Sequence, residues 1–202
     1  MPTESRPRTW FEEWHEPGEF YHAADLGVRA FFLTDTNPPQ YLREAFHVGW
    51  FGSIWRDNHG LCEVRLLGEG GFPDAQLRAD GVHLDLEVTM ALAKDKQMFK
   101  EWRELRAKTQ RGEIVLAEPP EEYEASAREA IPRVVGQKAD KHYAGSASTT
   151  LLICANTALS AEEMARLTEP WKDRFAAIYL ICGIDVVRVW PTRSILTGRW
   201  PF

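Results

Sequence analysis

The sequence predicts an α/β fold in which one mixed sheet is flanked by helices. Apolar runs of strand length alternate with segments of helical periodicity. A two-residue Asp-Gly turn joins two strands whose polar and apolar residues alternate. The run TTLLIC is apolar enough for a strand that is buried on both faces. The length of 202 residues is sufficient for one substantial domain.

The first 37 residues mix proline, glycine and aromatic side chains. We expect residues 1–37 to form an irregular or partly helical arm, and residues 38–202 to form the single domain on which it packs. The side chains expected to hold the arm are Trp10, Phe11, Trp14 and Phe20.

From residue 38 onward, the predicted order is helix, strand, two-stranded hairpin, two helices, strand, helix and two strands. The first helix begins at QYLREAF and ends before a turn at DNHG. The second covers ALAKDKQMFKEWRELRAK, and the third is expected to break or kink at Pro132 and Gly136. Ser160 and Glu163 form a capping box for the last helix. The other expected strands are LCEVRLL, FAAIYLICG and DVVRVWP.

Charge and composition exclude several classes of protein. The net charge of −6 argues against a protein that coats nucleic acid through a broad basic surface. No apolar run is long enough for a transmembrane helix, and the N-terminus lacks a signal core, so a cytoplasmic location without membrane contact is expected. The six histidines form no HExxH pattern. We expect Cys62, Cys154 and Cys182 to be free thiols, because they form no CxxC pair.

The most informative stretch is FPDAQLRADGVHLDLEVT, at residues 72–89. If Asp80-Gly81 forms a hairpin turn, Asp74 lies opposite Glu87 and Gln76 lies opposite Asp85. Carboxylates in directly opposed positions repel each other, whereas a hard divalent cation reverses the sign of that interaction. The pattern therefore predicts a Mg²⁺ or Mn²⁺ site formed by Asp74 and Glu87 with Asp85. The alternative is the solvated face of an amphipathic hairpin.

FPD followed by LEVT resembles the PD-(D/E)XK nuclease superfamily, which has the restriction-endonuclease-like fold. Pro73-Asp74 matches the first half of its motif. The second half is Glu87-Val88-Thr89, with threonine at the usual lysine position, or Asp85-Leu86-Glu87. The resemblance covers roughly residues 38–190 and implies a sandwich with the core order αβββααβαβ.

The resemblance also implies an activity: Mg²⁺- or Mn²⁺-dependent hydrolysis of phosphodiester bonds in DNA, or less readily in RNA. Asp74 and Glu87 would ligate the metal, assisted by Asp85 and the Val88 carbonyl. Lys138 or Lys141, on the helix before TTLLIC, would replace the missing lysine near the scissile phosphate. Glu44 on the first core helix would hold a second ion or orient a water, with Glu63 as the fallback.

A second hypothesis comes from a different class of function. The acidic net charge and the missing motif lysine also suit a catalytically inactive module of the same fold that acts in protein interaction or scaffolding. DNA could be bound directly or through a partner protein. Trp190 and Trp200 mark a candidate subunit contact in a homodimer.

Overall fold

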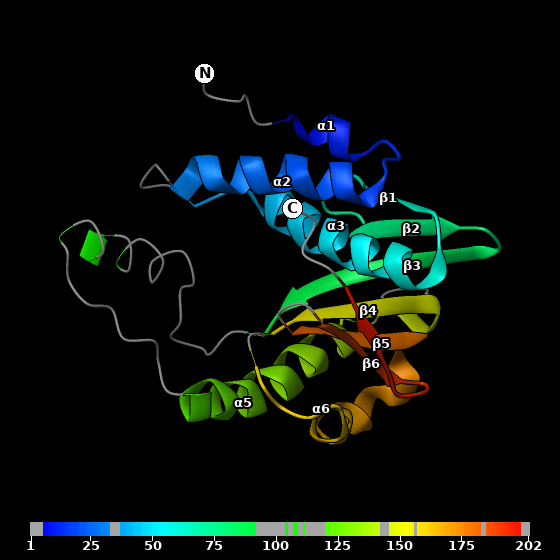
Figure 1. Ribbon diagram of the computed structural model, residues 1–202. Coiled ribbons are helices and arrows are strands. Elements are labelled where there is room, and N and C mark those ends of the chain that lie inside the picture. Colours follow the sequence, from blue (N-terminus) through cyan, green and yellow to red (C-terminus); the bar gives the residue numbers. More distant parts are fainter. Residues whose placement is uncertain are drawn as a thin grey trace.

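The computed structural model describes residues 6–32, 37–91, 104, 107–108, 111, 120–141, 146–155, 157–182 and 185–198. Within these ranges the chain forms a seven-stranded mixed sheet with helices on both faces (Figure 1). The predicted α/β class is confirmed. Most of the helix predicted over 91–108 lies outside the described residues, as does Trp200.

The strands lie in the sheet in their order along the chain. β4 pairs in parallel with β3 and with β5, and every other pairing in this sheet is antiparallel. The last strand was not predicted from the sequence. The strands are β1 (Cys62–Leu66), β2 (Ala75–Ala79), β3 (Val82–Met90), β4 (Thr149–Cys154), β5 (Ala177–Cys182), β6 (Asp185–Trp190) and β7 (Ser194–Thr197).

Helices cover the two faces of the sheet as separate layers, each with its own apolar core (Figure 1). β4 contributes to both, since Leu152 belongs to the first core and Leu151 to the second. This confirms the expectation of a strand buried on both faces. The first layer is α1 (Arg8–Phe11), α2 (Pro17–Phe32) and α3 (Gln40–His59); the second is α5 (Pro120–Ala139) and α6 (Ala161–Thr168), with short 3₁₀ turns at Ser146–Ser148 and Glu169–Arg174.

The N-terminal segment is more regular than expected, because α2 is a full helix that lies on α3 (Figure 1). Phe11 and Phe20 are completely buried in the first core, as predicted. Trp14 has a different environment: its ring lies 4.5 Å from the Arg65 guanidinium and 4.2 Å from that of Arg78. These cation–π contacts attach the segment to the hairpin side of the sheet.

Gly49 allows α2 and α3 to approach each other closely. A methyl group at this position would lie 2.7 Å from the Cα and 2.8 Å from the backbone nitrogen of Tyr21, so a helix would have to move. We expect Gly49→Ala to lower the free energy of unfolding by about 1–3 kcal/mol, measured by chemical denaturation. Gly68→Ala is the control, because no atom lies within 4 Å of its added methyl group. Equal stability of the two variants would contradict this packing.

Two helix boundaries differ from the prediction. The DNHG segment is not a separate turn, because α3 continues to His59. Gly60 follows as the C-terminal cap, and its φ of 94° suits glycine. α5 continues through both Pro132 and Gly136. Its apolar face is buried in the second core, and this packing outweighs the local penalty of an internal proline. The capping box is confirmed in its first half, since the Ser160 hydroxyl accepts from the Glu163 N–H at 3.2 Å.

The three cysteines are free thiols, as expected, and Cys62 and Cys154 are buried. Burial raises the pKa of Cys62 to about 11 and that of Cys182 to about 12, so neither is reactive as a thiolate near neutral pH.

No helix within the described ranges has the length and apolar character needed to span a membrane.

Candidate active site

The hairpin register places the first candidate residue. Five pairs between β2 and β3 follow the predicted pairing, from Ala75 opposite Leu86 to Ala79 opposite Val82. One more pair in this register sets Asp74 opposite Glu87. The Asp74 Oδ2 accepts a 2.7 Å hydrogen bond from the Val88 N–H, which fixes the carboxylate against β3.

Glu87 lies on the face of β3 that is covered by the second helical layer. Its register partner on β4 is Leu151, a member of the second core, and only 3% of Glu87 is exposed. Lys138 extends from α5 and forms an ion pair with the Glu87 carboxylate. The same ammonium lies 3.9 Å from the Asp74 Oδ2. Two carboxylates from neighbouring strands therefore share one cationic group from a helix.

The electrostatics of this cluster are those of crowded, partly dehydrated acids. Burial raises the pKa of Glu87, and the neighbouring Asp74 charge raises it further, while the Lys138 ammonium opposes both effects. Burial also raises the pKa of Glu44, again with a contribution from Asp74. The charge of Asp74 thus acts on both glutamates, which places all three acids in one electrostatic neighbourhood.

Glu44 lies on the first turns of α3 and accepts a 2.7 Å hydrogen bond from the Gln40 side-chain amide. It lines a pocket of about 260 Å³ between α3, the end of β3 and α5. Lys138 contributes to the same lining, so the pocket adjoins the carboxylate pair. The pocket is also lined by Arg43 and His47 from α3, and by Thr89 and Met90 from β3.

Three other candidates from the sequence have different surroundings. Asp85 accepts a 2.8 Å hydrogen bond from Gln76 and lies 3.5 Å from His83. Glu63, the fallback for Glu44, pairs with Arg78 at 2.7 Å on the outer strands. Lys141 lies exposed just beyond α5, and its charge has the smallest of the effects on the pKa of Glu87. The structure therefore groups Asp74, Glu87, Lys138 and Glu44.

The sequence interpretation missed Gln40, Arg43 and His47. Helical spacing is the available signal, because residues three or four apart share a face of a helix. Gln40 and His47 lie four and three residues from Glu44, and Arg43 lies four residues before His47. Burial and the nearby Arg43 charge lower the pKa of His47 to about 4. This imidazole is therefore neutral at physiological pH and carries one N–H donor.

The donor set fits a divalent cation only in part. Within the described residues, no group of three or more His, Cys, Asp or Glu side chains is arranged to hold a metal ion. Mg²⁺ nevertheless often uses one or two carboxylates and completes its shell with water and phosphate oxygens. Asp74 and Glu87 already hold a cation between them, the Lys138 ammonium.

Trp190, a candidate for a subunit contact, is half-buried and makes several contacts within its own chain. It packs against the second core, and its indole Nε1 donates a 3.0 Å hydrogen bond to the Thr168 hydroxyl. The Lys172 ammonium lies 5.4 Å from its ring centroid.

Comparisons of the chain with protein-family models, with curated proteins and with solved structures found no match.

Proposed function

We propose that the protein is a Mg²⁺- or Mn²⁺-dependent nuclease with a restriction-endonuclease-like fold, and that it hydrolyses phosphodiester bonds in DNA. One observation carries the proposal: Asp74, Glu87 and Lys138 meet at the junction of β2, β3 and α5. Lysine is absent from the motif position, where Thr89 stands, but a helix supplies one to the same cluster. The mixed sheet between two helical layers is compatible with this fold.

In this proposal, Asp74 and Glu87 hold the cation and Glu44 positions water at the edge of the cluster. Bound there, Mg²⁺ or Mn²⁺ would polarise a phosphoryl oxygen and acidify water. Hydrolysis forms a bond from the water oxygen to phosphorus, breaks the P–O ester bond and delivers a proton to the leaving oxygen. Lys138, whose ammonium lies 3.9 Å from the Asp74 Oδ2, would stabilise the negative charge that develops on the phosphoryl group.

The ion pair between Lys138 and Glu87 has a consequence for this scheme. Glu87 gives up at least part of its contact with the ammonium when a cation binds, and Lys138 is then free to face the substrate. Lys138 keeps 16% of its side chain exposed and also lines the adjoining pocket, so it has room to make this move. One ammonium thus faces two carboxylates, and a bound cation would offset the negative charge that remains.

Calorimetric titration with Mg²⁺ and Mn²⁺ tests the site directly. We expect the wild type to bind either metal with millimolar or tighter affinity, and the variant with both Asp74→Ala and Glu87→Ala to show no binding. Binding should weaken as the pH falls toward 4.5, the ordinary pKa of glutamate, because the raised pKa of Glu87 makes protons compete early.

A cleavage screen on single- and double-stranded DNA completes the test. We expect cleavage that requires Mg²⁺ or Mn²⁺ and stops on chelation. Failure of the wild type to bind metal, together with inert DNA in Mn²⁺, would overturn the proposed function.

The second candidate is a catalytically inactive interaction module. One observation favours it: Lys138 and Glu87 form an ion pair, which can also serve as a purely structural contact. In that case, substitution of Lys138 would change the stability of the protein, and there would be no enzymatic activity for it to reduce. The metal titration separates the two candidates.

A further inference from the structure

The pocket beside the carboxylate pair has the chemistry of an anion site. We propose that it binds the terminal phosphate of a DNA strand, and that the protein therefore acts preferentially on phosphorylated ends. The inference rests on the proposed function, because the carboxylate pair would then act on the next phosphate along the strand. The pocket is lined by Arg43, His47 and Gln40 from one face of α3, and by Lys138 from α5.

Side chains with hydrogen-bond-donating nitrogen atoms line the pocket from α3 and from α5. Arg43 offers a planar guanidinium, which matches a phosphate through paired hydrogen bonds. His47 is neutral and adds one N–H donor. The Gln40 amide, at the first residue of α3, has a second N–H besides the one that it donates to Glu44. Lys138 closes the side next to the catalytic carboxylates. A phosphate monoester carries more acceptor oxygens and more charge than an internal diester, so it satisfies this donor set better.

The size of the pocket limits the ligand. Its volume of about 260 Å³ corresponds to about nine water molecules, which is below the range of drug-sized ligand pockets. A phosphate group with part of its sugar fits this space, whereas a duplex segment does not. The pocket therefore suits the end of a strand.

Acidic side chains also lie at or near the pocket, and their negative charge opposes the binding of an anion. Glu44 lines the pocket, but its carboxylate already accepts the Gln40 hydrogen bond. Asp74 and Glu87 lie beyond Lys138, and the proposed cation would neutralise them. Arg43 and Lys138 are the cationic side chains among the residues that line the pocket.

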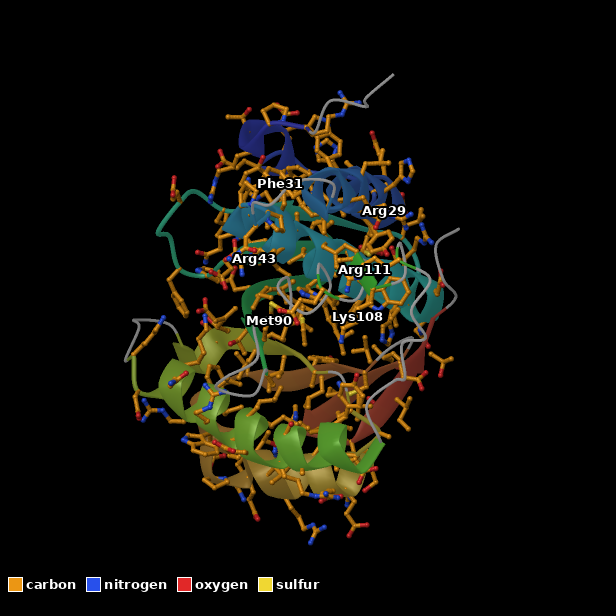
Figure 2. All side chains as sticks on the ribbon, turned by 90° about the vertical axis from the view of Figure 1, so that its left-hand side faces the viewer. Arg29, Phe31, Arg43, Met90, Lys108 and Arg111 are labelled. Carbon is orange, nitrogen blue, oxygen red and sulfur yellow. The ribbon has the colours of Figure 1, made fainter. Side chains whose placement is uncertain are left out.

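The side of the molecule shown in Figure 2 supports the approach of a polyanion. Arg29 from α2, Arg43 from α3, and Lys108 and Arg111 from the chain between β3 and α5 all lie on this side, above α5 (Figure 2). Met90, which lines the pocket, is seen on the same side, at about the height of Lys108 in this view. These basic side chains face one side of a protein whose net charge is −6, so a nucleic-acid strand that approaches from this side would meet them.

Binding of short DNA strands by fluorescence anisotropy in Ca²⁺ tests the proposal. The probes are one sequence with a 5′-phosphate, with a 3′-phosphate or with neither, and an unphosphorylated strand two nucleotides longer, whose two added diesters match the charge of a terminal monoester. We expect one of the two phosphorylated strands to bind about tenfold more tightly than the longer strand. Thymidine monophosphate should compete weakly, because it lacks the neighbouring diester that reaches the carboxylate pair.

Matched variants locate the effect. Arg43→Met should abolish the preference for the phosphorylated strand, and His47→Ala should weaken it, with folding of both checked by thermal unfolding. Arg29 is basic and on the same side but pairs with Asp25 at 2.7 Å, so Arg29→Met should weaken all strands equally and keep the preference. Equal gains from both terminal phosphates, tight binding of the free nucleotide, or a preference that survives in Arg43→Met and His47→Ala would overturn the proposal. A preference without cleavage would refute the nuclease activity and retain the anion site.

Discussion

Replacing Lys138 with methionine is expected to slow DNA cleavage by about a hundredfold or more, which is the effect of removing one donor that faces developing negative charge. Methionine keeps much of the apolar stem and removes the ammonium that Asp74 and Glu87 share. Single-turnover cleavage at saturating Mg²⁺ measures this loss without a contribution from product release.

The same substitution is expected to lower stability by about 3 kcal/mol at neutral pH, because it leaves a buried carboxylate without its cation. A group whose pKa is raised in the folded state favours folding below its ordinary pKa and loses that contribution as the pH rises. Without Lys138, the pKa of Glu87 should rise further. The stability difference from wild type should therefore be largest near neutral pH and should shrink as Glu87 becomes protonated.

Lys141→Met is the matched control for this experiment. It removes the same charge three residues further along the chain, where the lysine is exposed and has only a weak effect on Glu87. We expect less than about a threefold change in rate and little change in stability. Equal effects of the two substitutions would assign the cluster a general electrostatic role and contradict a specific one for Lys138.

The hairpin could be predicted from the sequence because its determinants are local. Asp80-Gly81 fixes the turn, the turn fixes the register, and the register sets Asp74 beside Glu87. The buried strand β4 was likewise evident from its uninterrupted apolar run. In both cases the signal lies within a few residues of the structure that it specifies.

Contacts between distant segments could not be predicted in the same way. Both Lys138 and Lys141 were candidates, and only the packing of α5 against β3 distinguishes them. Arg43 and His47 enter the site because the start of α3 lies near the end of β3, about fifty residues later in the chain. The continuation of α5 through Pro132 has the same origin, since burial of its apolar face in the second core decides against the local preference.

Glu87→Gln is expected to reduce cleavage at least about a thousandfold, or about 4 kcal/mol of transition-state stabilisation, and to remove the calorimetric signal of Mg²⁺ binding. The amide has nearly the same shape as the carboxylate, so the loss reports charge more than packing. Lys138 would lose its closest partner but still lies 3.9 Å from Asp74 and is partly exposed, so we expect the fold to persist. Circular dichroism and thermal unfolding would check this.

Asp85→Asn provides the comparison that makes the Glu87 experiment decisive. It removes the same charge from the same face of β3, two residues and about 6.6 Å away. Asp85 is engaged by Gln76 and lies near His83, while Lys138 contacts Glu87. A metal site centred on Asp74 and Glu87 therefore predicts less than about a tenfold loss for Asp85→Asn. If Asp85→Asn were the more damaging of the two, the site would be centred one pleat closer to the hairpin turn, and the role assigned to Lys138 would have to be withdrawn.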